Sequence, residues 1–158
     1  MNVHHGTNHP TSQLTCELFA LADVLACAHQ ATEYAAAHGF DARETWEFSI
    51  AVSELATNVT RHGGGGQLTV EYVTSPEHGL VLTARDSGPG IADVAAAFDD
   101  DFSEGRVLSH HVSPAHRKGL GSGLGAVRRM TDEVQVESTP GAGTIVRAFK
   151  RSRGHGRG

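Results

Sequence analysis

The chain has 158 residues, of which 39% are hydrophobic and 20% charged. This is enough apolar material for the core of one domain, and it excludes a chain that is disordered over most of its length. The formal net charge of -5 argues against a nucleic-acid-binding protein, because phosphate recognition needs a basic face. No apolar run approaches the ~20 residues that span a bilayer, and the N-terminus lacks the apolar core of a signal peptide. We therefore expect a cytoplasmic protein that contacts neither nucleic acid nor membrane.

Both ends of the chain have the composition of tails. Residues 1–11 are polar and rich in His, and residues 151–158 are basic and rich in Gly, so we expect one domain over 12–150. The two cysteines, Cys16 and Cys27, have neither a CxxC nor a zinc-site spacing. We expect both to be reduced residues of the core.

Hydrophobic periodicity predicts the first elements. Apolar residues alternate over 13–19, which indicates a strand, and they recur at helical spacing over 21–38 until Gly39. Asp41 followed by Glu44 has the form of a capping box. It predicts a second helix that begins there and continues to roughly Val59. Three residues of this helix are expected to contact the core: Trp46, Ile50 and Leu55.

The remaining elements predict a two-layer architecture. After the glycine tract 63–66, two alternating segments indicate a hairpin, and a short helix, a polar loop, another helix and two strands follow. Their expected bounds are 67–73 and 80–86 for the hairpin, 92–98 for the short helix, 99–118 for the loop, 122–131 for the next helix, and 133–138 and 143–149 for the strands. This order predicts an α+β fold, a two-layer α/β sandwich with helices on one face of a mixed, mainly antiparallel sheet.

Glu54 and Asn58 lie four residues apart on the second predicted helix, so both project from one face. A carboxylate and an amide oxygen side by side can hold a hydrated Mg²⁺ and accept a proton from a nucleophile. At this spacing, however, the two residue types more often form a solvated helix face.

Two glycine-containing segments follow. Asp86 ends a predicted strand and precedes Gly88 and Gly90, which is typical of a turn but also suits a carboxylate that accepts from the exocyclic amine of a purine. A run of alternate glycines precedes the helix over 122–131, where backbone N–H groups can hold phosphates; its members are Gly119, Gly121, Gly123 and Gly125. Such a run also occurs in hinges, and it matches neither a Walker A motif nor a dinucleotide fingerprint.

Together with Gly143 and Thr144, these segments resemble the ATP-binding boxes of the GHKL (Bergerat-fold) superfamily, which contains gyrase, Hsp90, histidine kinases and MutL. The resemblance covers roughly 45–150. Within that superfamily, a few stretches look like the anti-sigma-factor and stressosome switch serine kinases: AVSELATNVTRHGGGGQLTVEYV, ARDSGPGI, DDDFSEG, GLGSGLGAVRRMTDEVQVES and GAGTIVRA.

The resemblance implies a site for ATP and Mg²⁺. It makes Glu54 the general base that deprotonates a partner Ser or Thr hydroxyl and Asn58 the Mg²⁺ ligand. Asp86 would bind the adenine amine, with Gly88 and Gly90 shaping the pocket and Thr144 beside the ring. The glycines of the run, Gly119, Gly121, Gly123 and Gly125, would wrap the phosphates, and Arg117 or Lys118 would offset their charge.

The implied function is an ATP- and Mg²⁺-dependent serine/threonine protein kinase of a bacterial partner-switching pathway. Its substrate would be a STAS-domain protein, either an anti-anti-sigma factor or a stressosome scaffold, and the same relatives suggest a homodimer. The alternative is a nucleotide-gated binding module that sequesters a sigma factor or activates a phosphatase with little catalysis. The intact Glu54 favours the enzyme.

One segment departs from the switch-kinase pattern. Residues 106–117 make the connection before the glycine run longer than in those kinases, and we interpret 99–118 as an enlarged ATP lid. This lid favours specialised binding. Its histidines, His110, His111 and His116, lie on a loop without a recognised ligand spacing, so we interpret them as solvated rather than as metal ligands.

Overall fold

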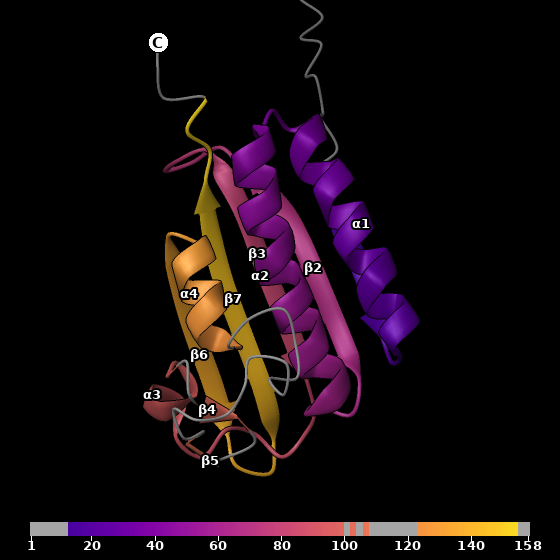
Figure 1. Cartoon of the computed structure of the whole chain (residues 1–158), viewed down its shortest axis with the longest axis vertical. Helices are drawn as coiled ribbons and strands as arrows, with labels where there is room; N and C mark the ends of the chain where they lie inside the picture. The colour runs from indigo at the N-terminus through magenta and orange to yellow at the C-terminus, as the bar shows by residue number, and fades with distance from the viewer. Residues whose placement is uncertain (1–12, 100–101, 104–105, 108–122, 155–158) are drawn as a thin grey trace, which may run out of the picture.

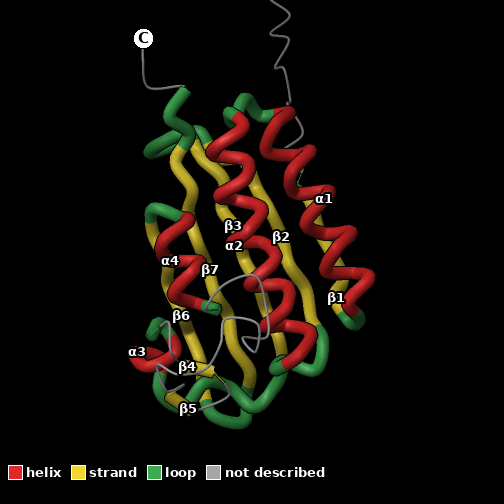
Figure 2. The backbone as a smooth tube through the Cα atoms, in the orientation of Figure 1, coloured by secondary structure: helices red, strands yellow, loops and turns green. Residues whose placement is uncertain are grey.

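The computed structural model describes residues 13–99, 102–103, 106–107 and 123–154. Helices α1, α2 and α4 cover one face of a five-stranded sheet (Figures 1 and 2). The arrangement confirms the expected two-layer α+β architecture. Among the described residues, no helix combines the length and the hydropathy needed to cross a membrane.

The sheet has the strand order β1-β2-β3-β7-β6. Its strands are β1 (Leu14–Leu18), β2 (Gly66–Val73), β3 (Gly79–Asp86), β6 (Glu133–Thr139) and β7 (Gly143–Arg151). Every pairing between them is antiparallel, whereas we expected a mixed, mainly antiparallel sheet. The reason is topological, because the connection from β3 to its neighbour β7 passes through α4 and β6 and returns in the opposite direction.

The helices begin and end close to the predicted residues. Helix α1 spans Leu21–Ala37, α2 spans Ala42–Arg61 and α4 spans Leu124–Met130. The predicted capping box opens α2: Asp41 accepts a hydrogen bond from the Glu44 N–H at 2.8 Å, and Glu44 accepts one from the Asp41 N–H at 2.9 Å. Two of the four N–H groups that a helix start leaves without partners are typically satisfied in this way.

The core lies between the helices and the inner face of the sheet. It is built from α1 and α2 residues such as Cys27 and Leu55 and from alternate strand residues such as Leu68 and Leu82, all at most 1% exposed. Cys16 and Cys27 are both buried and free, as expected. The expectation for Trp46 is wrong, because its side chain is 60% exposed. The buried stripe of α2 passes through its neighbours instead: Thr45, Phe48, Val52, Leu55 and Val59. Ile50 is half-buried beside this stripe.

Helix α3 (Val94–Ala97) lies within the segment expected as a short helix. The region expected as a loop contains a pair of two-residue strands, β4 (Phe102–Ser103) and β5 (Arg106–Val107). Residues 100–101, 104–105 and 108–118, which include the three histidines, lie outside the described residues. At the other end of the chain, the Ser152 N–H donates a hydrogen bond to the His78 carbonyl at 2.9 Å, and the Arg153 N–H donates one to Glu44 at 2.7 Å.

Candidate active site

Glu54 is a buried acid on the side of α2 that packs against α4. Its side chain is only 5% exposed, and its carboxylate accepts a hydrogen bond from the Gly123 N–H at the start of α4. Burial raises the pKa of this carboxyl, while the Gly123 N–H and the positive charges of Arg129 and Arg61 oppose the rise. A carboxylate whose pKa is moved toward neutrality is a better proton acceptor than an exposed one.

Asn58 lies one turn beyond Glu54 and is half-buried near the end of α2. Its backbone carbonyl accepts hydrogen bonds from the N–H groups of His62 (2.9 Å) and Gly63 (3.1 Å). These bonds end the helix and turn the chain toward Asp86, against which Gly63 packs. The end of α2 that follows Asn58 therefore lies at the end of the molecule at which β3 ends (Figure 1).

Asp86 is the last residue of β3, and the strand register places it between Gly66 of β2 and Thr144 of β7. One carboxylate oxygen accepts a hydrogen bond from the Gly88 N–H at 2.9 Å. A Cβ atom at Gly63 or at Gly143 would overlap Asp86, and Gly143 has a φ of 94°. Only glycine suits these two positions. They hold Asp86 at the sheet end, a role that the sequence motifs did not reveal.

Thr144 is buried and joined to the loop after Asp86 through Ser138. The two hydroxyl groups lie 2.9 Å apart, and the Ser138 hydroxyl also accepts a hydrogen bond from the Ile91 N–H at 2.7 Å. Ser138 thus ties the segment containing Gly88 and Gly90 to β7. The sequence gives no signal for it, because its contribution depends on the pairing of β6 with β7.

The glycine run is described only in part. Gly123 has a φ of 62° and forms the N-cap of α4, and Gly125 is buried inside that helix. The other predicted phosphate-binding residues lie outside the described residues: Arg117, Lys118, Gly119 and Gly121. Among the described residues, the structure therefore places Gly123 at Glu54, and Asp86 beside Thr144.

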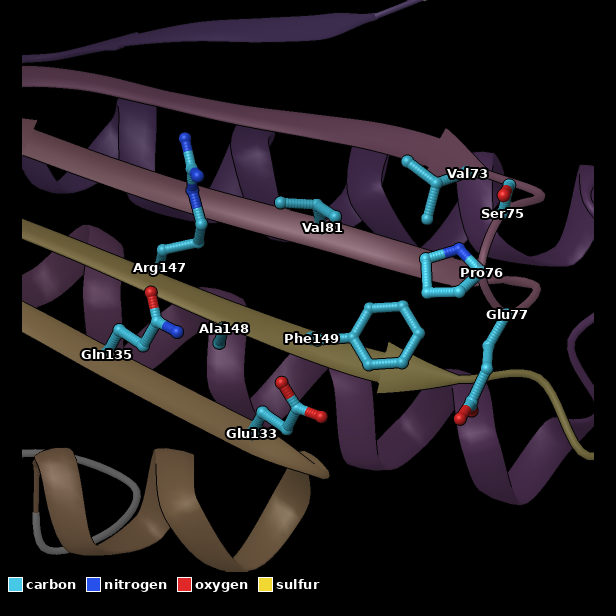
Figure 3. Close-up of a pocket in the computed structure, with 10 residues that line it drawn as sticks. All are labelled: Val73, Ser75, Pro76, Glu77, Val81, Glu133, Gln135, Arg147, Ala148 and Phe149. Carbon is cyan, nitrogen blue, oxygen red and sulfur yellow. The ribbon is translucent and has the colours of Figure 1, made fainter.

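A separate pocket of about 320 Å³ lies on the sheet face that the helices leave uncovered (Figure 3). Val73, Val81 and Phe149 give it an apolar floor, and Glu77 and Glu133 are among the polar residues around it. None of the predicted site residues lines this pocket. The candidate active site is instead on the helix-covered side of the sheet.

The family of the chain follows from comparison with known proteins. Residues 19–150 match the family model described as the histidine kinase-like ATPase domain. The chain belongs to this family. Its fold is shared with a chain of the crystal structure of the RsbU and RsbW domains of Rv1364c from Mycobacterium tuberculosis, with a TM-score of 0.59 and 16% identity. That alignment covers 90% of this chain and 33% of the longer one.

Several curated relatives are similar over most of their length. The serine/threonine-protein kinase RsbT of Bacillus subtilis (strain 168) is 33% identical over 129 residues, which are 81% of this chain and 88% of the relative. The anti-sigma F factors of Thermoanaerobacter sp. (strain X514) and Bacillus subtilis (strain 168) are 30% and 31% identical, over 68% of this chain and 70% and 69% of their own lengths. These relatives confirm the expected partner-switching kinase, and the family implies the use of a nucleotide.

Proposed function

We propose that the protein transfers the γ-phosphoryl group of ATP to a Ser or Thr hydroxyl of a STAS-domain regulatory protein in the cytoplasm, as part of a bacterial partner-switching pathway. The observation that supports this proposal most directly is the buried Glu54, whose raised pKa suits a proton acceptor. The similarity to RsbT, a serine/threonine-protein kinase, supports the class of acceptor residue.

In the proposed reaction, Glu54 takes the proton of the partner's hydroxyl. The hydroxyl oxygen forms a bond to the γ-phosphorus, and the bond from that phosphorus to the β–γ bridging oxygen breaks, so that ADP leaves with the electron pair. Phosphoryl transfer of this kind needs little covalent chemistry from the protein. The contribution of Glu54 is to orient the hydroxyl and to accept its proton.

Asp86 is proposed to bind the adenine amine. Among the described residues, hydrogen bonding to Asp86 uses only one of its carboxylate oxygens, through the Gly88 N–H, and the other oxygen can accept from an amino group. Thr144 of β7 is paired with Asp86 of β3 and would contact the adenine ring. The glycine run, with Arg117 or Lys118, would hold the phosphates.

The donor atoms at the end of α2 fit Mg²⁺. This ion prefers oxygen ligands and usually keeps several waters, so it is held by one or two protein groups together with substrate phosphates. The side-chain oxygen of the half-buried Asn58 is such a ligand, one turn from the Glu54 carboxylate. Bound there, the ion would neutralise charge on the phosphates, and Asn58 would fix its place.

The test is phosphoryl transfer from radiolabelled ATP to candidate STAS-domain proteins of the native host. Glu54→Gln keeps the shape of the side chain and removes the proton acceptor, so we expect transfer to fall by about 100-fold or more while Mg-ADP binding is retained. Glu137→Gln, at an exposed position of β6, is the control and should match the wild type. Transfer at the wild-type rate by Glu54→Gln would remove the proposed base.

The similarity to anti-sigma F factors supports a second candidate function. In this alternative the chain is a nucleotide-gated binding module that sequesters a sigma factor or activates a phosphatase, with little catalysis. The Glu54→Gln variant separates the two functions. A binding module would keep its regulatory effect on the partner in this variant, whereas a kinase would lose it.

A further inference from the structure

Trp46 is an apolar side chain on the solvent-facing side of α2, and it is 60% exposed. The other large apolar side chains that are exposed among the described residues lie at the start of α1 or just before it: Phe19, Leu21 and Leu25. Tryptophan and arginine side chains carry much of the binding energy of protein interfaces. An exposed tryptophan on another helix is therefore a candidate contact for a partner protein.

Trp46 belongs to the same ridge of α2 as the proposed base. Ridges on a helix connect residues four positions apart, and this one consists of Trp46, Ile50, Glu54 and Asn58. Along the ridge the side chains change from exposed at Trp46 to half-buried at Ile50 and buried at Glu54. A helix rises about 1.5 Å per residue, so Trp46 lies about 12 Å from Glu54 along the axis. The ridge therefore leads from the surface to the candidate active site.

The last turn of α4 lies beside the turn of α2 that carries Trp46 (Figure 1). Lys150 connects the two turns, because it donates to the Met130 carbonyl at 2.9 Å and pairs with Glu47, the residue after Trp46. This turn of α4 carries Arg128 and Arg129, both exposed. The two arginines and the tryptophan are therefore presented on the same side of the molecule.

The exposed charges of α2 and α4, two helices that are described in full, are all positive. They belong to four arginines: Arg43, Arg61, Arg128 and Arg129. The acids of these helices are buried or nearly so: Glu44, Glu47 and Glu54. Glu47 pairs with both Arg43 and the buried Lys150, so these three groups keep one net positive charge. This surface is opposite in sign to the whole chain, whose formal net charge is -5.

We propose that the protein substrate docks on this surface, which we define as Trp46 and Ile50 with the arginines Arg43, Arg128 and Arg129. The inference rests on the proposed function. A protein that brings a hydroxyl to Glu54 along the ridge covers Trp46 as well. The substrate would place an apolar side chain on Trp46, about 12 Å from the acceptor hydroxyl, and acidic residues opposite the arginines. Trp46 would thus determine which proteins are phosphorylated without taking part in the chemistry.

The first test is kinetic and uses the STAS-domain protein that accepts phosphate in the radiolabel assay. Trp46→Ala should raise the KM for this protein by about tenfold or more. Its kcat and its KM for Mg-ATP should stay within about twofold of the wild type, because the base and the nucleotide contacts are unchanged. Trp46→Phe should recover part of the affinity. Leu25→Ala, at a position that is 66% exposed on α1, is the matched control and should keep the wild-type KM.

The second test uses the fact that Trp46 is the single tryptophan of the chain. The partner is prepared with any tryptophan of its own replaced by phenylalanine and is added to the full chain with Mg-ADP. Its docking should move the emission maximum of Trp46 to shorter wavelength, because the ring passes from water into an apolar contact. Raising the salt from about 0.05 M to about 0.3 M should raise the KM for the partner several-fold, because the opposite charges are screened.

A wild-type KM in Trp46→Ala, or an emission maximum that does not move when the partner binds, would overturn the docking surface. An equal rise of the KM in Leu25→Ala would do the same, since any exposed apolar residue would then serve. A KM that is independent of salt would contradict an acidic partner surface. These results leave the proposed function intact. The function itself fails if the wild type transfers phosphate to no STAS-domain protein, and the docking surface then fails with it.

Discussion

Asp86 is held by the backbone around it rather than by other charged side chains. The Gly88 N–H binds one carboxylate oxygen, and Gly63 and Gly143 allow the neighbouring chain segments to approach closely. A carboxylate fixed in this way is ready to accept a hydrogen bond without losing conformational freedom on binding. This arrangement explains how a single acid can select the adenine amine in the proposed site.

Asp86→Asn should weaken the binding of Mg-ADP by about tenfold or more, because a hydrogen bond to a charged group contributes about 1.5–3 kcal/mol. The asparagine oxygen can still accept from the Gly88 N–H, so the fold should be kept. Isothermal titration calorimetry measures the change. Asp132→Asn, at a residue that accepts a hydrogen bond from the Arg151 N–H, is the control and should bind as the wild type does. Equal affinity in both variants would contradict the adenine role of Asp86.

At the scale of elements, α4 is the shortest of the three helices that cover the sheet. It has seven residues, which is too short to be stable without its surroundings. Its buried residues pack against the core, and the pair of Lys150 with Glu47 holds its last turn. Because the glycine run leads into α4, the stability of this helix also determines how well the run is placed.

Lys150→Met should lower the free energy of unfolding by about 2 kcal/mol, because the nearly buried Glu47 carboxylate then keeps only its ion pair with the exposed Arg43. Lys150 lowers the pKa of Glu47. The stabilisation is therefore present above the usual glutamate pKa and is lost as the pH falls through the lowered one. Urea denaturation at neutral and acidic pH should show a difference between variant and wild type that shrinks in acid. Glu77→Gln, in the exposed pair with Arg151, should have little effect at either pH.

At the scale of the whole molecule, the proposed site is assembled from distant parts of the chain. Glu54 and Asn58 come from α2, Asp86 from β3, Gly123 from α4 and Thr144 from β7. Any nucleotide that contacts all of them joins both layers of the fold. Its binding energy must then appear as stability of the whole domain.

Mg-ADP at about 100 times its dissociation constant should stabilise the fold by about 2.7 kcal/mol, which corresponds to a rise in the melting temperature of roughly 5 to 10 °C. A thermal melt measures it. Mg-GDP at the same concentration is the control, because guanine presents a carbonyl oxygen where adenine presents its amine, and the carboxylate of Asp86 repels it. Equal shifts with both nucleotides would contradict adenine selection by Asp86.

Local patterns predicted the elements of the fold well. Alternation located the strands, and the residues of the capping box, Asp41 and Glu44, placed the start of α2 correctly. The prediction for Trp46 failed because helical spacing alone does not say which of two apolar faces is buried. The all-antiparallel pairing could not be predicted, since it depends on which strand becomes the neighbour of β3.

The motifs predicted part of the candidate site. Glu54, Asp86 and Thr144 could be identified from the order of motifs, and they stay predictions until they are tested. Ser138 and Gly63 could not be identified, because their contributions come from contacts between segments that are far apart in the sequence.

The register between β3 and β7 has a consequence for how such a chain tolerates insertions and deletions. Asp86 faces Thr144 across this ladder, and side chains alternate between the faces of a sheet. Losing one residue from the tight turn between β6 and β7 would shift the pairing in which Ser138 faces Thr144 and would turn one of the two hydroxyls to the wrong side of the sheet. Length variation should therefore accumulate in the 99–118 connection, while the turn before Gly143 keeps its length.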